Sequence, residues 1–211
     1  MTYRLVEIDD KSRHQHYYLE PTDHCLYLGE YTARGGWGYS EVNQLIFNLK
    51  KGVDRKELSD YQFKEQAIES VANLIGKAIN VGAVSFIPVP PSKMITDPLY
   101  DDRLVRILQL VKNHNQECHW SDVISQAIST EANHLTPNRK RPEEIAALYQ
   151  VAEVDPDQFR DIILVFDDII TTGAHFKAMQ RKLHAVFPNK TIAGFFIARR
   201  VFKEEEKDNS V

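Results

Sequence analysis

The sequence predicts an α/β fold in which a parallel β-sheet carries helices on both faces. Two largely apolar runs, AVSFIPVP at residues 83–90 and DIILVF at residues 161–166, have the pattern of strands buried on both faces. Amphipathic segments with helical periodicity separate these runs from each other and from a third run, TIAGFFIA, at residues 191–198. Such alternation is typical of parallel sheets built from βαβ units.

The first part of the chain predicts a small antiparallel unit and two helices. Short strand-like runs at residues 3–8, 16–20 and 25–31 alternate with polar turns. A glycine-rich turn at residues 33–40 leads into a helix that ends at Gly52. The apolar stripe of this helix is formed by Val42, Leu45, Ile46 and Leu49. A longer helix is expected over residues 58–79, with a stripe formed by Ile68, Val71, Ala72, Ile75 and Ile79.

The second part of the chain alternates helices and strands around the main apolar runs. Asp97 and Pro98 are expected to open a helix with a stripe at Leu104, Ile107, Leu108 and Val111. A short strand is expected at residues 119–125, a mobile polar loop at 129–141 and a short helix from Pro142. The last predicted elements are a helix at residues 174–187 and the strand at 191–198.

The expected organisation is one globular domain with decorations. Of its 211 residues, 43% are hydrophobic, which is enough to bury one sizeable core. We assign residues 1–82 to an N-terminal hood of short strands and helices, 83–202 to the α/β core and 203–211 to a disordered tail.

Composition narrows the possible partners and the compartment. A formal net charge of −4 disfavours binding to nucleic acid and to membrane surfaces, but a small anionic metabolite needs only a few local cations. The charged N-terminus has no signal-peptide pattern and no apolar run is long enough to span a bilayer, so we expect a cytoplasmic protein. Cys25 and Cys118 have no CxxC spacing, so we expect two reduced thiols and no zinc ribbon.

The segment ILVFDDIITTGAH, residues 163–175, combines a strand, two acids and a helix start. At the start of a helix the first backbone amides are unpaired and attract anions. Thr171 and Thr172 supply hydroxyl donors, and Gly173 allows a close approach of the backbone. Asp167 and Asp168 would repel a bare phosphate, but they suit ribose hydroxyls or a hydrated magnesium ion.

Other interpretations of this segment explain less of it. A solvated acidic turn with threonines that cap the next helix accounts for each part separately, but not for the whole combination in order. The chain has no GK[ST] sequence for a Walker loop, and DDIIT lacks the DxD spacing of aspartyl-phosphate phosphatases. The pattern therefore favours a pocket for a ribose phosphate.

The same segment resembles the motif of type I phosphoribosyltransferases that binds 5-phosphoribosyl-1-pyrophosphate (PRPP). The resemblance implies a type I phosphoribosyltransferase-like core in which Asp167 and Asp168 contact the ribose hydroxyls. The resemblance also implies that the 5-phosphate binds to the turn formed by Thr171, Thr172, Gly173, Ala174 and His175. Many members carry threonine or serine at the position of His175, so phosphate binding is expected to depend more on pH here.

Upstream, the resemblance is closest to the ComF-like branch of that family, here without the zinc ribbon. The sequence PVPPSK follows the first core strand, where the family has its pyrophosphate loop, which implies that Pro91, Ser92 and Lys93 face the diphosphate. A proline-rich strand exit with a purely structural role is the alternative. Arg103 lies where ComF-like members often carry an arginine, and a solvated helix face is its alternative.

NRKR, residues 138–141, lies where the family has a flexible catalytic loop. Cations such as Arg139 and Arg141 would neutralise the departing pyrophosphate, and a solvated run of charges is the alternative.

The resemblance implies an enzyme that binds PRPP with Mg²⁺ and transfers the phosphoribosyl group to a nucleobase-like acceptor. Aromatic side chains of the hood can stack on such a base or belong to the core of the hood: Tyr27, Tyr31, Trp37 and Tyr39. The alternative function is a non-catalytic regulatory or accessory protein that binds PRPP. The family often forms dimers, so a homodimer or a partner protein is also an expectation.

Overall fold

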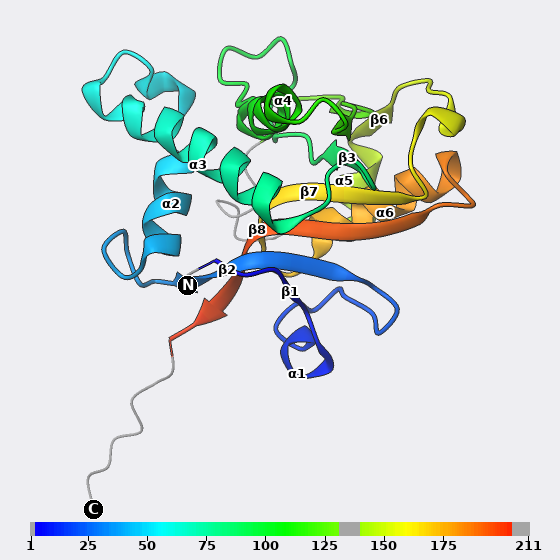
Figure 1. Cartoon of the computed structure of the whole chain (residues 1–211), viewed down its shortest axis with the longest axis horizontal. Helices are drawn as coiled ribbons and strands as arrows, with labels where there is room; N and C mark the ends of the chain where they lie inside the picture. Colours follow the sequence, from blue (N-terminus) through cyan, green and yellow to red (C-terminus); the bar gives the residue numbers. More distant parts are fainter. Residues whose placement is uncertain (1–2, 131–139, 204–211) are drawn as a thin grey trace, which may run out of the picture.

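A six-stranded sheet forms the centre of the computed structural model, which describes residues 3–130 and 140–203. Its strands lie in the order β1-β2-β8-β7-β3-β4 (Figure 1). Neighbours from β2 to β4 are parallel, and only β1 is antiparallel to its neighbour. The strand bounds are Val6–Glu7 (β1), Cys25–Ala33 (β2), Ser85–Pro88 (β3), His119–Trp120 (β4), Ile162–Ile170 (β7) and Thr191–Phe202 (β8). The predicted α/β class with a mostly parallel sheet is confirmed.

Helices flank this sheet in two groups. In the first group α3 packs against both α2 and α4, and in the second α5 packs against α6 (Figure 1). The helix bounds are Asp10–Arg13 (α1), Glu41–Leu49 (α2), Gln62–Ala78 (α3), Arg103–His114 (α4), Pro142–Ala147 (α5) and Ala174–Val186 (α6). Short 3-10 turns occur at Val53–Arg55, Ser59–Tyr61 and Pro156–Gln158. In the part of the chain that the structure describes, no helix is both long and apolar enough to cross a membrane.

The core lies on both faces of the central strands. Phe86 and Ile87 of β3 and Val165 and Phe166 of β7 are fully buried, which explains why these strands read as apolar runs rather than as an alternating pattern. Most of the predicted helix stripes are buried as well, and Leu45 and Ile79 are partly exposed at the rim of the core. Burial of these stripes fixes which side of each helix faces the sheet.

The prediction of a small antiparallel unit at the N-terminus is wrong for β2, its longest strand. Only β1 is antiparallel, whereas β2 is a full member of the central sheet and runs parallel to β8 from Cys25 to Ala33. The sheet therefore includes strands from both sides of residue 82. Residues 16–20 form turns instead of the expected strand, because their polar groups bond to the segment that follows β7.

Two boundaries in the middle of the chain also differ from prediction. The helix expected from Asp97 begins at Arg103, because the Asp97 carboxylate accepts hydrogen bonds from Ser129 Oγ and the Leu99 amide within a turn. The strand expected at residues 119–125 is divided between two sheets. Its beginning pairs with β3 as β4, and its end forms β5 (Ile124–Gln126), which is antiparallel to β6 (Tyr149–Val151).

The connections diverge between β3 and β7, which are neighbours in the sheet. After β3 the chain passes through α4 to β4 on one side, and after β7 it passes through α6 to β8 on the other. Open parallel sheets bind ligands at such a switch point, beside the carboxyl ends of the strands. The fold therefore favours a ligand site between the segments that leave β3 and β7.

A buried asparagine fixes the position of α2 relative to β2. Asn43 accepts a hydrogen bond from the Thr32 amide at 2.9 Å and donates to the carbonyls of Thr32 and Gly36 at 3.0 and 3.1 Å. Gly36 has a φ of +80°, which glycine adopts without strain. Asn43 thus ties the glycine-rich turn to the helix.

Substitution of this asparagine is expected to destabilise the protein. Asn43→Ala removes the side-chain acceptor of the buried Thr32 amide and one donor to the Thr32 carbonyl, so it should lower the free energy of unfolding by about 2 kcal/mol. Urea denaturation measures this change. The partly exposed Gln44→Ala in the same helix is the control and should change stability by less than about 0.5 kcal/mol. Equal effects of the two substitutions would contradict the role of Asn43.

Candidate functional site

A pocket of about 850 Å³ lies at the switch point between β3 and β7. A pocket of this size accommodates a small-molecule ligand. The segment after β3 and the start of α4 form one side, and the end of β7 with the following turn forms the other. The lining residues are Tyr31, Ile46, Phe47, Lys50, residues 88–93, residues 99–105, Asp122, Asp167, Asp168, Ile169, Thr171, Thr172, His175 and Arg200.

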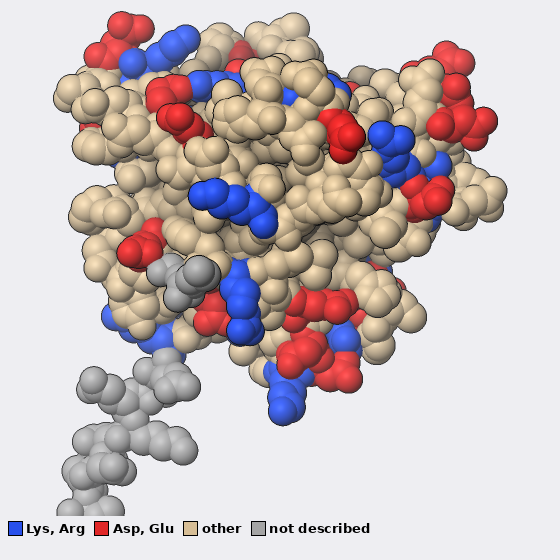
Figure 2. All heavy atoms as spheres, viewed as in Figure 1, with Lys and Arg blue, Asp and Glu red and all other residues tan. Residues whose placement is uncertain are grey.

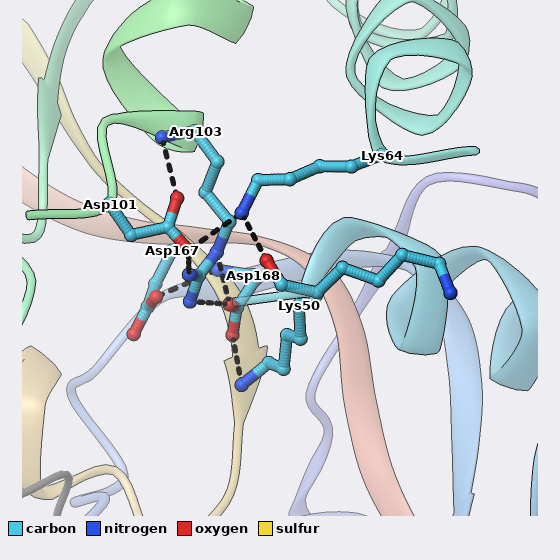
Figure 3. Close-up of polar contacts among 7 residues, drawn as sticks. Lys50, Lys64, Asp101, Arg103, Asp167 and Asp168 are labelled. Carbon is cyan, nitrogen blue, oxygen red and sulfur yellow. Dashed lines mark hydrogen bonds and ion pairs between the residues drawn. The ribbon is translucent and has the colours of Figure 1, made fainter. Parts of the chain in front are cut away.

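Asp168 is buried and is held by two cations (Figure 3). Arg103 donates to its Oδ2 from Nε at 3.1 Å and from Nη2 at 2.6 Å, while Lys50 Nζ lies 3.0 Å from its Oδ1. Burial disfavours the charged form of Asp168, but Lys50 and Arg103 outweigh this effect and hold its pKa below the usual range. Asp168 is therefore ionised and already occupied by partners within the protein.

Asp167 is in a different electrostatic position. Burial and the negative charge of Asp168 raise its pKa to about 7. Its Oδ1 accepts the backbone amide of Asp168 at 2.8 Å, and its other oxygen accepts no hydrogen bond from the residues that the structure describes. Of the two adjacent carboxylates, Asp167 is thus the one with an oxygen available to a ligand.

In the turn after β7, Thr171, Thr172 and His175 line the pocket, whereas Gly173 and Ala174 are buried and are not among the lining residues. The amides of Thr172, Gly173 and Ala174 donate to no acceptor within residues 3–130 and 140–203. They precede or begin α6, where the helix dipole is positive. Gly173 has a φ of +85°, and a Cβ there would lie 3.0 Å from Leu19 Cδ2, so both the backbone and the neighbour favour glycine. Together these groups form a site that can bind an anion.

The N-terminal segment supports this turn from behind. His16 Nδ1 lies 2.6 Å from the Thr171 carbonyl oxygen, and the Tyr18 amide donates to the Thr172 carbonyl at 2.9 Å. Burial of His16 lowers its pKa, so at neutral pH it bonds to Thr171 as an uncharged ring. These contacts engage the carbonyls of the turn and leave its amides directed away from them.

His175 lines the pocket from the first turn of α6. Its Nδ1 lies 2.9 Å from the hydroxyl of Tyr149, which is buried and has a pKa raised by that burial. Tyr149 therefore remains protonated and fixes the orientation of the His175 ring.

The residues expected upstream are divided between the pocket and other parts of the molecule. Pro91, Ser92 and Lys93 line the pocket after β3, and Arg103 contacts Asp168 across it. Arg141 is exposed at the start of α5, where its amide donates to Glu144, and it is not among the pocket-lining residues. Arg139 lies outside the described residues, as do the expected tail from 204 and most of the expected loop at 129–141.

The lining residues that were not identified from the sequence include Lys50, Asp101 and Phe47. Lys50 follows α2, Asp101 precedes α4 and binds Arg103 Nη1 at 2.5 Å, and Phe47 lies one helical turn before Lys50. No local motif marks them, because the fold brings them to β7 from distant positions. Among the aromatic hood residues, Tyr31 lines the pocket and packs near Phe47, with ring centroids 6.2 Å apart. The buried Tyr27 and the exposed Trp37 and Tyr39 are not among the lining residues.

Charges of both signs are interspersed on the face drawn in Figure 2. Lys and Arg side chains there alternate with Asp and Glu and do not form a continuous basic groove.

A scan against protein-family models and a search of curated proteins both found no match to this chain.

Asp167 should make stability depend on pH. Because its folded pKa of about 7 lies above the ordinary value of about 4, the folded state holds an extra proton between these values. The free energy of unfolding therefore falls as pH rises from about 4 to about 7. Asp167→Asn should remove this contribution, so the difference between variant and parent should grow with pH in denaturation curves. Parallel pH profiles would contradict the assignment.

Asp168→Asn should lower the stability of the protein at neutral pH. It leaves Arg103 with only Asp101 and removes the counter-charge of Lys50, so the free energy of unfolding should fall by about 3 kcal/mol. Chemical denaturation at pH 7 measures the loss. The exposed Glu153→Gln is the matched control, with an expected change below about 0.5 kcal/mol. A loss no larger than in this control would show that the ion pairs contribute little.

Proposed function

We propose that this chain binds PRPP with Mg²⁺ and transfers its phosphoribosyl group to a nucleobase-like acceptor, with release of pyrophosphate. In this proposal the chain is a type I phosphoribosyltransferase, similar to the ComF-like branch. The observation that carries the proposal is the row of three amides, Thr172 to Ala174, that have no acceptor in the described parts of the chain. They follow the acid pair of β7 after three intervening residues, at the switch point of a parallel sheet. One ligand that satisfies both parts is a ribose phosphate.

The two ends of PRPP match different parts of the pocket. The 5-phosphate would accept hydrogen bonds from the amides of the turn and from the hydroxyls of Thr171 and Thr172. The ribose hydroxyls would donate to Asp167, whose second oxygen has no partner among the described residues. The diphosphate would lie beside residues 91–93, where Lys93 has no ion-pair partner in the described parts of the chain.

Magnesium fits this site as part of the ligand. Within the described residues, no group of three or more His, Cys, Asp or Glu side chains is arranged to hold a metal ion by itself. Asp167 offers one free carboxylate oxygen, so Mg²⁺ would be held mainly by PRPP oxygens with Asp167 beside it. When bound, Mg²⁺ would supply positive charge beside the diphosphate.

Transfer breaks the bond between ribose C1 and the pyrophosphate oxygen and forms a bond from C1 to the acceptor. The pyrophosphate leaves with the electron pair of the broken bond, and the proton of the acceptor N–H passes to solvent. Lys93 would stabilise the negative charge of the pyrophosphate. The acceptor would lie against Tyr31 and Phe47, whose rings line the Lys50 side of the pocket. Aromatic rings at this position suit a planar base.

Thermal unfolding with PRPP and Mg²⁺ tests binding directly. Ligand at 100 times its dissociation constant should stabilise the parent by about 2.7 kcal/mol. Asp167→Asn should lose most of this gain while it remains folded, whereas Glu153→Gln should keep it. Titration with ribose 5-phosphate and with pyrophosphate assigns each end of the pocket. No stabilisation of the folded parent at millimolar PRPP would refute the proposed function.

Measurement of pyrophosphate release distinguishes an enzyme from a non-catalytic regulator. If PRPP binds, a panel of nucleobases is added and free pyrophosphate is measured over time. Release that requires both a base and Asp167 supports transfer. Binding without release for every base would favour the alternative that we also consider, a regulatory protein that binds PRPP in the same pocket.

A further inference from the structure

Lys64 of α3 is a fully buried lysine, with 0% of its side chain exposed, and it is not among the residues that line the pocket. Its Nζ donates to Asp101 Oδ2 at 2.7 Å and to the carbonyl oxygen of Lys51 at 2.7 Å. Burial lowers the pKa of Lys64, and the charge of Asp101 opposes this effect. A buried ammonium is retained only with close partners, so both contacts are strong constraints on the atoms that Lys64 touches.

The first contact leads to Asp168 through α4. Asp101 Oδ2, which accepts from Lys64, also accepts from Arg103 Nη1 at 2.5 Å. The other side of the same guanidinium donates to Asp168 through Nε and Nη2. Because a guanidinium is planar and rigid, the position of Asp101 determines how Arg103 faces Asp168.

The second contact leads to Asp168 through α2. Lys64 holds the carbonyl of Lys51, and the preceding residue, Lys50, places its Nζ 3.0 Å from Asp168 Oδ1. The two routes close a ring of interactions, the Lys64 ring, formed by Lys64, Asp101, Arg103, Asp168, Lys50 and the Lys51 carbonyl (Figure 3). One buried ammonium thus contacts both routes that end on Asp168.

We propose that Lys64 is a positioning residue of the ligand site. It holds Arg103 and Lys50 on Asp168, so that Asp168 stays occupied and Asp167 alone accepts a hydroxyl of the bound sugar phosphate. This inference rests on the proposed function for the identity of the ligand. A lysine that only ties α3 to its neighbours would affect stability and leave ligand affinity unchanged.

The test is a double-mutant cycle with Lys64→Met and Asp101→Asn. The dissociation constant of PRPP with Mg²⁺ is measured for each variant by calorimetry, well below the temperature at which that variant unfolds. Each single substitution should weaken binding about tenfold, and the double variant should be no weaker than Asp101→Asn alone, because both act on one network. Lys77→Met is the matched control: this lysine of the same helix is exposed and does not belong to the Lys64 ring, so PRPP affinity should remain that of the parent. Unchanged affinity in Lys64→Met, or additive losses, would overturn the proposal.

A second cycle distinguishes failure of this inference from failure of the proposed function. Lys64→Met, Asp168→Asn and their combination are compared by urea denaturation, without ligand. No hydrogen bond or ion pair joins Lys64 to Asp168 directly, so independent residues at these positions would have additive effects on unfolding. The ring instead couples them and predicts that their effects are not additive. If the parent does not bind PRPP, non-additive effects still support the ring, and additive effects overturn it. If Lys64→Met does not fold, Lys64→Gln, which removes the charge but keeps a hydrogen-bond donor, replaces it in the same cycle with Asp168→Asn.

Discussion

The pair of adjacent carboxylates at the end of β7 is the constraint on which the rest of the site depends. Two negative charges next to each other at the end of a buried strand repel one another and lose hydration. The protein resolves this by an unequal distribution of partners: Asp168 receives Arg103 and Lys50, and Asp167 receives one backbone amide. The opposite pKa shifts of the two carboxyls follow from this difference.

This unequal distribution links the fold to the chemistry of the pocket. Arg103 reaches Asp168 because α4 starts after the long turn that follows β3, and Lys50 reaches it because Asn43 fixes α2 against β2. The carbonyls of the following turn are engaged by the segment that contains His16 and Tyr18, and its amides from Thr172 to Ala174 have no acceptor among the described residues. Elements from across the chain therefore leave one oxygen of Asp167 without a hydrogen-bond donor among the described residues, in the strand that leads to the start of α6.

The local part of the site could be predicted from the sequence, and the long-range part could not. Residues 163–175 form a continuous strand, turn and helix start, so the positions of Asp167, Asp168 and the turn follow from local patterns. Lys50 and Lys64 carry no local signal, because a lysine next to an amphipathic helix or within one is usually a solvated residue. Their importance comes from packing between α2, α3 and β7, which a pattern along one chain does not encode.

The errors in the predicted fold have a similar origin. β2 reads as a short surface strand, but its pairing with β8 depends on an edge formed by residues more than 160 positions later. Asp97 and Pro98 have the composition of a helix start, but a hydrogen bond from Ser129 holds Asp97 in a turn. In both places a distant contact outweighed a local preference.

A crystal structure of the chain with PRPP and Mg²⁺ would reveal the sugar and phosphate contacts together. We expect ribose hydroxyls within hydrogen-bonding distance of Asp167 and the 5-phosphate on the amides of residues 172–174. We also expect that Arg103 and Lys50 keep their contacts with Asp168. A ligand whose hydroxyls bind Asp168 after Arg103 has moved away, or a phosphate bound outside the turn, would contradict this arrangement.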